Sequence, residues 1–347
     1  MWGTRIGVTF VLFSLTACER DSTPTTQSAS PAAEVVVYTA LDRQFSEPIL
    51  REFTRRTGIA ARPVYDTEAT KTVGLANRIR AEADRPRCDV FWNNEVVNTI
   101  RLKNEGLLQP LGIVDLTHIP EAFRDPEGYW CGFAARARVL LINTELVPED
   151  QRPTSIRALA DPRWRGRVGM AKPLFGSTAT HVATLFAKLG EDDAAALLKA
   201  IRANEVQVLS GNKGVAEAVG AGRLAIGLTD TDDAIAELDA GRPVVMVFPD
   251  SEPGGLGTLV FPNTVSLIKG APHPDAGRRL IEYLLSPEVE ATLARGPSGQ
   301  IPLHVNATVT SRVVRLADLR PMEVDFAAAA AVFQRAARFV EQEFLAP

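Results

Sequence analysis

The sequence predicts an α/β protein with two lobes, and two observations carry that prediction. Short apolar runs suited to buried strands alternate with amphipathic helical segments through most of the chain. One long extended run at 132–143 interrupts this alternation, which then starts again. Residues 34–347 are enough chain for about two domains. We therefore expect two similar lobes, with the long run crossing between them.

The first run of elements starts at residue 34. The β-branched stretch 34–40 predicts a buried strand, and apolar residues spaced from Phe45 to Phe53 predict a helix that ends near Gly58. This βα order continues and predicts a parallel sheet with right-handed crossovers, whose ligands lie beyond the carboxyl ends of the strands. The further elements are strands over 60–66 and 88–93, and helices around Leu75 and Ile79 and over 95–108.

The second run follows the crossing strand and ends in a return crossing. It predicts strands over 167–173, 205–211 and 223–230, helices over 177–190, 193–204 and 215–222, and the return crossing over 257–270. Helices are then expected over 273–286, 287–294 and 322–345. The expected organisation is lobe 1 over 34–138 with 258–305, lobe 2 over 139–257, and a C-terminal helical segment over 306–347.

The N-terminus is typical of an exported protein. Residues 1–17 combine Arg5 with an apolar run too short to span a membrane, which is the layout of a signal peptide. The motif LTAC at 15–18 resembles a bacterial lipobox, in which Cys18 is lipidated. Residues 18–33 have no packing pattern and predict a flexible tether. A short core helix at 6–15 is the alternative.

Composition limits the partners. The formal net charge of −4 argues against a nucleic-acid partner, and the hydrophobic fraction of 46% supplies ordinary cores. Besides Cys18 the chain has Cys88 and Cys131. In an exported protein they could form a disulfide, or they could be two small buried residues.

Several strings give the chain a specific resemblance. They are "VVVYTALDRQFSEPILREFTRRTGI", "DVFWNNE", "GLLQPL", "ARARVLLINTELV", "DPRWRGRVGMAKPLFGSTATH" and "GAPHPDAGRRLIEYLLSPEVE". The chain resembles the extracytoplasmic solute-binding proteins of ABC importers, in the family 1 group that includes ferric-ion-binding proteins. The resemblance implies a periplasmic-binding-protein-like fold, with two α/β lobes joined by a hinge and the ligand in the cleft between them. It also implies delivery of that ligand to a membrane permease.

The resemblance does not extend to the iron ligands. Ferric-binding relatives carry a histidine where this chain has Asp42, and an acidic residue that corresponds to Asn94. Their adjacent tyrosines fall at Asp230 and Thr231. These positions cannot supply a tyrosinate clamp, so ferric binding is not carried over residue by residue.

The remaining polar residues at these positions form a different constellation. If the family layout holds, Asp42, Asn94, Asp230 and Asp232 lie on loops that face the cleft. Their oxygens suit an ammonium group or a hard cation, with Asp42, Asp230 and Asp232 as the metal ligands. The alternative for the aspartates is helix capping, in which Thr229, Thr231 or Asp232 caps the following helix.

Across the cleft from these acids we expect an anion site. Gly176 leads into a helix start with Ser177, Thr178 and Thr180, and free backbone N–H groups at such a start bind anions. The corresponding segment of ferric-binding relatives holds the accompanying anion. An ordinary N-cap is the alternative.

Three further positions are candidates for ligand contact. Thr67 and Glu68 follow the second strand, where they could instead cap a helix, and Arg136 on the crossing strand could bind an anion bidentately. His181 is more typical of a structural histidine than of a metal ligand.

Two classes of function compete. The first is a non-enzymatic binding lipoprotein of the periplasm or cell envelope, which needs no cofactor and takes a metal ion with a companion anion, iron among the candidates. An organic phosphate, a phosphonate or another small charged organic solute is the alternative ligand. The expected partners are a small charged ligand and an inner-membrane ABC permease, with no nucleic acid, a monomeric state, and membrane contact only through the lipid anchor. The rival is an exported hydrolase using Asp230 and Asp232, but the sequence has no H-E-x-x-H and no G-x-S-x-G.

Overall fold

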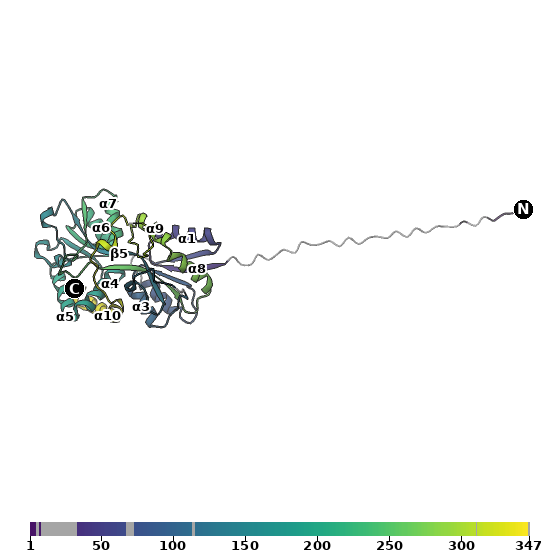
Figure 1. Cartoon of the computed structure of the whole chain (residues 1–347), viewed down its shortest axis with the longest axis horizontal. Helices are drawn as coiled ribbons and strands as arrows, with labels where there is room; N and C mark the ends of the chain where they lie inside the picture. The colour runs from purple at the N-terminus through teal and green to yellow at the C-terminus, as the bar shows by residue number, and fades with distance from the viewer. Residues whose placement is uncertain (5–6, 8–32, 67–72, 113–114, 310, 346–347) are drawn as a thin grey trace. The chain divides into compact units, whose positions relative to one another are not determined.

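The computed structural model describes residues 1–4, 7, 33–66, 73–112, 115–309 and 311–345. The chain divides into Met1–Ala32 and a body, Ala33–Pro347, which carries the labelled helices and strands of Figure 1. Cys18, Thr67, Glu68 and most of 1–33 lie outside the described residues. Within the described part of the chain, no helix has the length and apolar character needed to cross a membrane.

The strands of the body follow one another in the order β2-β1-β3-β10-β5-β8-β6-β7, with β4 on β10 and β9 on β5. Parallel pairing joins β1 with β2 and β3, and β6 with β7 and β8. Two parallel sets are therefore linked through β5 and β10. The strands are β1 (Glu34–Thr39), β2 (Ala60–Tyr65), β3 (Val90–Asn93), β4 (Leu108–Gln109), β5 (Trp130–Asn143), β6 (Val168–Ala171), β7 (Gln207–Leu209), β8 (Ile226–Asp230), β9 (Val244–Val247) and β10 (Val260–Ile268).

Helices connect these strands as the alternating pattern predicts. In α1 the side chains of Ile49, Leu50 and Phe53 are buried, and Gly58 at φ 71° ends the helix in the left-handed region. The helices are α1 (Arg43–Thr57), α2 (Val73–Ala81), α3 (Val97–Asn104), α4 (Gly176–Leu189), α5 (Glu191–Ala203), α6 (Asn212–Gly220), α7 (Thr231–Asp239), α8 (Pro274–Leu284), α9 (Pro287–Arg295) and α10 (Phe326–Phe339), which continues as a π-turn at Val340–Phe344.

Separate hydrophobic cores define two lobes. Lobe 1 is the half built on β1–β4, where Val37, Phe53 and Leu280 belong to one buried cluster. Lobe 2 is the half built on β6–β9, where Met170 and Ile226 belong to another. The predicted two-lobed α/β fold is thereby confirmed.

The C-terminal helix contributes to both cores. Phe326 and Phe333 of α10 pack into the lobe 1 cluster, whereas Val340 and Phe344 beyond it pack into the lobe 2 cluster. Within the predicted helix over 322–345, the α-helix begins only at Phe326, because the side chain of Asp325 caps it there by accepting from the N–H groups of Ala327 and Ala328.

The crossing strand is irregular where it leaves lobe 1. Ala134 has φ 43°, in the left-handed region that disfavours residues with a Cβ, and β10 has a register shift between Phe261 and Asn263. The N–H of Ala134 donates to Glu290 Oε1 at 2.6 Å, and Asn263 Nδ2 donates to the carbonyl of Ala134. The strand β5 pairs with β10 as far as Ala137, and from Arg138 on it pairs with β8 and β9.

Cys88 and Cys131 are buried free thiols, so a disulfide between them is not formed. The register explains why. Trp92 of β3 and Cys131 of β5 both pair with Val265, which places a whole strand between them, and Cys88 lies four residues before Trp92. Strands are about 4.8 Å apart, so the separation exceeds the roughly 7 Å that a disulfide allows between Cα atoms.

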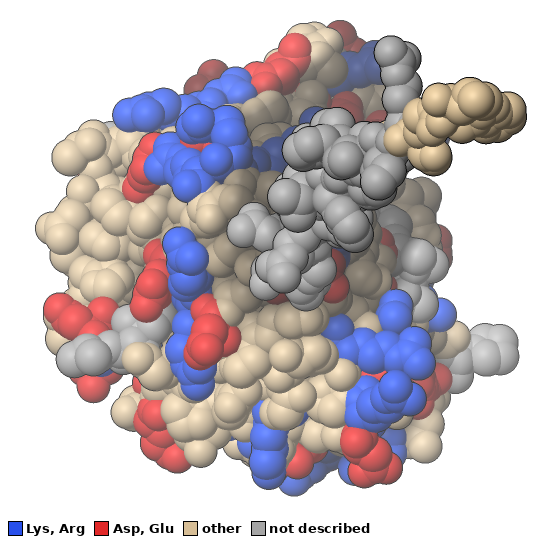
Figure 2. Space-filling model, turned by 90° about the vertical axis from the view of Figure 1, so that its right-hand side faces the viewer, with Lys and Arg blue, Asp and Glu red and all other residues tan. Residues whose placement is uncertain are grey.

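Basic and acidic side chains are interspersed on the face of the body shown in Figure 2. Among the described residues the two signs also meet in ion pairs, such as Arg56 with Glu288 at 2.5 Å and Arg80 with Glu105 at 2.6 Å. The described residues visible in Figure 2 therefore form no broad basic surface of the kind that a nucleic-acid backbone requires.

Candidate functional site

A small pocket lies where the parallel strands of lobe 2 end. Its cavity volume is about 30 Å³, room for an ion or one or two water molecules. Asn94 reaches it from lobe 1 and Arg136 from the crossing strand, so the pocket lies between the lobes. The other lining residues belong to lobe 2: Ala171, Lys172, Phe175, Gly176, Ser177, Thr178, Ser210, Gly211, Asn212, Asp230 and Asp233.

Two helices begin at this pocket without a side-chain cap. The N-cap residues are Phe175 for α4 and Gly211 for α6, and neither helix has a side-chain cap hydrogen bond. The first helical hydrogen bonds are donated by the N–H of Ala179 to the carbonyl of Phe175 in α4, and by the N–H of Val215 to the carbonyl of Gly211 in α6. The N–H groups that precede Ala179 and Val215 in the first turns therefore have no acceptor within their helix. Both positive helix ends therefore face one cavity, which favours an anion there.

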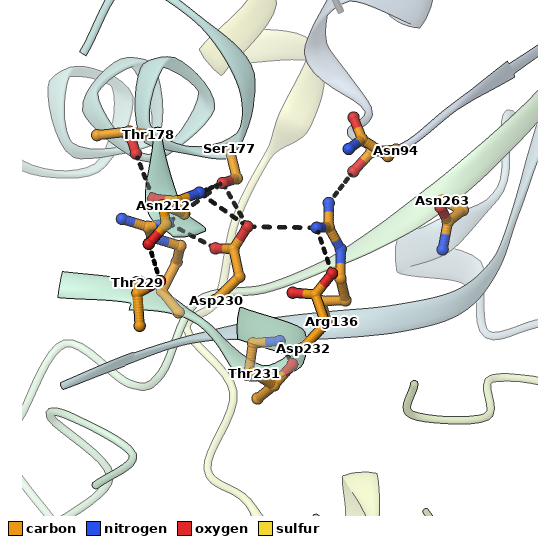
Figure 3. Close-up of polar contacts among 12 residues, drawn as sticks. Asn94, Arg136, Ser177, Thr178, Asn212, Thr229, Asp230, Thr231, Asp232 and Asn263 are labelled. Atoms are coloured by element: carbon orange, nitrogen blue, oxygen red, sulfur yellow. Dashed lines mark hydrogen bonds and ion pairs between the residues drawn. The ribbon is translucent and has the colours of Figure 1, made fainter. Parts of the chain in front are cut away.

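Asp230 is the centre of the polar network beneath these helix starts. Its carboxylate accepts from Arg138 Nη1 at 2.5 Å, Ser177 Oγ at 2.6 Å, Asn212 Nδ2 at 3.0 Å and Arg136 Nη1 at 3.3 Å (Figure 3). The residue is 1% exposed. Burial alone would raise the pKa of Asp230, but the charges of Arg138 and Arg136 outweigh it and the pKa is lowered. Asp230 is thus an ionised carboxylate with its acceptor capacity filled.

The two arginines differ in their surroundings. Arg138 is fully buried and also donates to Ser177 Oγ at 3.2 Å and to Asn212 Oδ1 at 3.1 Å. Arg136 bonds Asp232 Oδ2 at 3.2 Å and the carbonyl oxygen of Asn94, and thereby connects lobe 2 with lobe 1. Burial opposes the charge of Arg136, yet Asp232 and Asp230 hold its pKa above the ordinary value.

The side chain of Ser177 serves this network rather than the cavity. Its hydroxyl proton goes to Asp230, while its oxygen accepts from Arg138 and from Asn212 Nδ2 at 2.8 Å. Thr178 Oγ1 donates to Asn212 Oδ1 at 3.2 Å. The side-chain hydroxyls of Ser177 and Thr178 are therefore both engaged within this network.

The sequence reasoning missed Asn212, and it did not place Arg138 among the site residues. Asn212 joins Ser177, Thr178, Asp230 and Arg138 from the start of α6 (Figure 3). The signal was present as Ser-Gly-Asn at the end of the strand predicted over 205–211, the same kind of strand-to-helix turn as at Gly176. Arg138 alternates with Arg136 on the crossing strand, a pattern that more often means side chains that face solvent or pair with carboxylates, and Arg138 pairs with the carboxylate of Asp230.

Several expectations about the acids are wrong. Asp230 and Ser177 do not face each other across the cleft, because β8 pairs with β6 and the loops that follow these strands are neighbours in lobe 2. Helix capping is also wrong for this cluster: Asp230 is the N-cap of α7 but makes no side-chain cap bond, and Thr229 Oγ1 donates to the carbonyl of Asn212 instead.

The predicted metal set is also not assembled. The acidic groups that come together are Asp230, Asp232 and Asp233, whose oxygens lie within 4.8 Å of one another. Asp42 belongs neither to this group nor to the pocket lining. It is the N-cap residue of α1, which begins at the next residue, Arg43. Arg136 already contacts Asp230 and Asp232, and its charge opposes a cation between them.

Two other residues lie just outside the pocket. Thr180 of α4 is fully buried and bonds Glu95 instead of lining the cavity. His181 is 2% exposed, and burial followed by the charge of Arg138 lowers its pKa to about 3. Its ring is neutral in the folded protein, and it does not belong to the acidic group described above.

The two-lobed fold and its interlobe pocket define an extracytoplasmic solute-binding protein. Residues 95–329 match the family model of the bacterial extracellular solute-binding proteins, and the chain belongs to that family. The resemblance read from the sequence is confirmed.

Known relatives cover most of the chain. It is 28% identical over 292 residues to "Iron uptake protein A1" of Synechocystis sp., covering 81% of this chain and 79% of the relative. Iron-bound HitA from Pseudomonas aeruginosa has a similar structure, with a TM-score of 0.79 at 24% identity, covering 89% of this chain and 99% of HitA. AfuA from Actinobacillus pleuropneumoniae, with fructose-6-phosphate bound, has a TM-score of 0.80 at 22% identity, covering 90% and 99%.

Proposed function

We propose that this protein is the binding component of an ABC importer and captures a small solute with a phosphate-like oxyanion group. The single observation that carries the proposal is the convergence of two uncapped helix starts, α4 and α6, on one interlobe pocket. Such N–H groups bind oxyanions without any charged side chain. Lys172 and Arg136, which both line the pocket, add positive charge.

The lobe 1 wall of the pocket supports a solute with a second polar end. Asn94 is 3% exposed, lines the cavity, and its Oδ1 has no hydrogen-bond partner among the described residues. A buried amide oxygen without a donor is costly, so a hydroxyl or ammonium group of the solute would compensate it. AfuA, whose solved complex holds fructose-6-phosphate, is a structural relative with this kind of ligand.

A ferric ion with a companion anion is the second candidate. The names of relatives favour it, among them Iron uptake protein A1 and iron-bound HitA. In this chain none of the described residues that line the pocket is a tyrosine, and Arg136 contacts two of the three clustered carboxylates. The helix starts would then hold the companion anion, so the same anion subsite serves both candidates.

Catalysis is not part of the proposal. An acid–base role needs a carboxyl group that can exchange a proton near neutral pH, whereas the pKa of Asp230 is lowered and its oxygens accept four donors. We further propose the organisation expected from the sequence: signal peptide 1–17, tether 18–33 with lipidated Cys18, lobe 1 over 34–138 with 258–305, lobe 2 over 139–257 and a C-terminal segment over 306–347. The mature protein would be a lipid-anchored monomer in the periplasm or cell envelope.

A ligand panel on residues 34–347 tests the proposed function. Thermal unfolding would be measured with inorganic phosphate, fructose 6-phosphate, an aminoalkylphosphonate and ferric citrate, and each solute would be checked for turnover. At a hundredfold excess over its dissociation constant, a true ligand adds about 2.7 kcal/mol of stability. Stabilisation by a phosphate-bearing solute is expected. Stabilisation by ferric citrate alone would select the second candidate, and product formation would overturn the binding role.

A further inference from the structure

Glu95 is a fully buried carboxylate that does not line the pocket. It follows β3 in lobe 1 and accepts from the N–H groups of Val97 at 2.6 Å and Asn98 at 3.0 Å, at the start of α3. Asn93 Nδ2 donates to it at 2.9 Å. These three donors come from within lobe 1 and fix the position of the carboxylate there.

A fourth donor reaches Glu95 from lobe 2. Thr180 Oγ1 donates to Glu95 Oε2 at 2.7 Å, and Thr180 is itself fully buried. Thr180 lies on α4, one turn after Gly176 and Ser177 and so on the same side of the helix. The helix whose first turn faces the pocket therefore contacts lobe 1 through its second turn.

From this geometry we propose that Glu95 and Thr180 form a latch that favours the closed form of the protein and so strengthens solute binding. The inference rests on the proposed function, in which the solute bridges the two lobes. When the lobes separate, Glu95 keeps its three donors from lobe 1 and the hydroxyl of Thr180 bonds water. The hydrogen bond from Thr180 to Glu95 therefore forms only in the closed form. It is then shielded from water, and a hydrogen bond to a carboxylate is strongest in such surroundings. Thr180 is a positioning residue, since it does not line the pocket.

Three variants of α4 test the latch. Thr180→Val removes the hydroxyl at nearly constant volume, and Thr180→Ser restores it. Thr184→Val is the matched control, because Thr184 is also fully buried but donates at 2.9 Å to the carbonyl of Thr180 within the same helix. Affinity for inorganic phosphate and fructose 6-phosphate would be measured by calorimetry. Closure would be measured as the radius of gyration by X-ray scattering, with and without solute.

We expect Thr180→Val to weaken binding about tenfold and to reduce the compaction on adding solute. Thr180→Ser and Thr184→Val should stay within about twofold of the unmodified protein. Equal affinity and equal compaction in Thr180→Val and Thr184→Val would overturn the latch and leave the proposed function standing. If the unmodified protein binds none of the four solutes of the ligand panel, the proposed function fails, and scattering without solute decides the latch. A larger radius in Thr180→Val than in Thr184→Val then supports it, and equal radii overturn it.

Discussion

The hydroxyl of Ser177, at the start of α4, donates a 2.6 Å hydrogen bond to the carboxylate of Asp230, at the end of β8. This bond joins two segments that the sequence separates by 53 positions. It also assigns their roles, because a hydroxyl and a carboxylate that satisfy each other serve to position the helix start. In the proposed function, binding is then the role of the backbone N–H groups at the start of α4.

Replacing Asp230 with alanine should destabilise the protein before any solute is added. Arg138 is fully buried and would lose the carboxylate that contacts it at 2.5 Å. Removing one partner of a buried pair costs about 3–5 kcal/mol, which urea unfolding of the unliganded protein would measure. Asp239→Ala, which breaks the exposed pair with Arg312, is the control and should change little. Unchanged stability with lost binding would instead mean that Asp230 contacts the solute directly.

Lys172 should contribute long-range attraction to the solute. It is exposed, it lines the pocket, and its ammonium lies 5.8 Å from the centre of the Phe175 ring. Lys172→Met is expected to weaken the binding of phosphate-bearing solutes several-fold at low salt, with a smaller effect as salt rises, because exposed charges are screened. Calorimetric titrations at two ionic strengths measure this difference. Lys199→Met, which removes another exposed ammonium, 3.5 Å from Glu343, should leave the affinity unchanged. A salt-independent loss in Lys172→Met would contradict the electrostatic role.

His181 should make stability depend on pH in a window below neutrality. Burial, and then the charge of Arg138, lowers its pKa to about 3 in the folded protein. An unfolded chain takes up the proton near pH 6.5, so the contribution of His181 is complete above that pH and is lost as pH falls toward 3. The expected slope is up to about 1.4 kcal/mol per pH unit.

His181→Met should remove this slope from urea-unfolding curves recorded at several pH values between about 6.5 and 4. Methionine suits the site because Met170, Val182 and Leu185 line the same small cavity. Leu185→Met, a change at a residue without a titratable group that lines the same cavity, is the control and should keep the slope of the unmodified protein. Parallel curves for His181→Met and the unmodified protein would refute the assignment.

Gly227 should couple the packing of β8 to the pocket. A Cβ at this position would lie 2.5 Å from Val215 Cγ1 and 2.9 Å from Val219 Cγ2, both on α6. Gly227→Ala would push α6 away from β8, and the displacement would move Asn212 at the start of that helix. We expect a loss of about 1–3 kcal/mol in unfolding free energy, measured in urea, together with weaker solute binding.

Gly214→Ala is the matched control within α6. Its Cβ would meet no atom closer than 3.8 Å, and alanine is favoured over glycine in a helix. Stability should therefore stay the same or rise. If Gly227→Ala were as stable and bound as tightly as Gly214→Ala, close packing of β8 against α6 would not be what positions Asn212.

Local patterns in the sequence were sufficient for the elements and the family. Apolar periodicity predicted the boundaries of α1 and α4 to within a few residues. This is possible because the buried face of a helix is encoded by the spacing of apolar residues within that helix. The Gly176–Thr178 helix start was also recognisable, since the signal for such a turn is local. Boundaries set by remote contacts were harder: the predicted helix over 322–345 begins at Phe326, where Asp325 caps it.

The amino-acid sequence by itself determined the alternation of strands and helices, the two-lobed class and the helix start that favours an anion. Only the tertiary structure decided how the charges are used. Strand pairing brought Arg138 opposite Asp230 and set Asn212 beside Ser177, which turned an apparent acidic ligand set into an internally paired network. The physical reason is sequence separation. Periodicity and turn chemistry depend on residues that are near neighbours in the chain, whereas the role of a buried charged side chain depends on the oppositely charged partner, which can come from any distant segment.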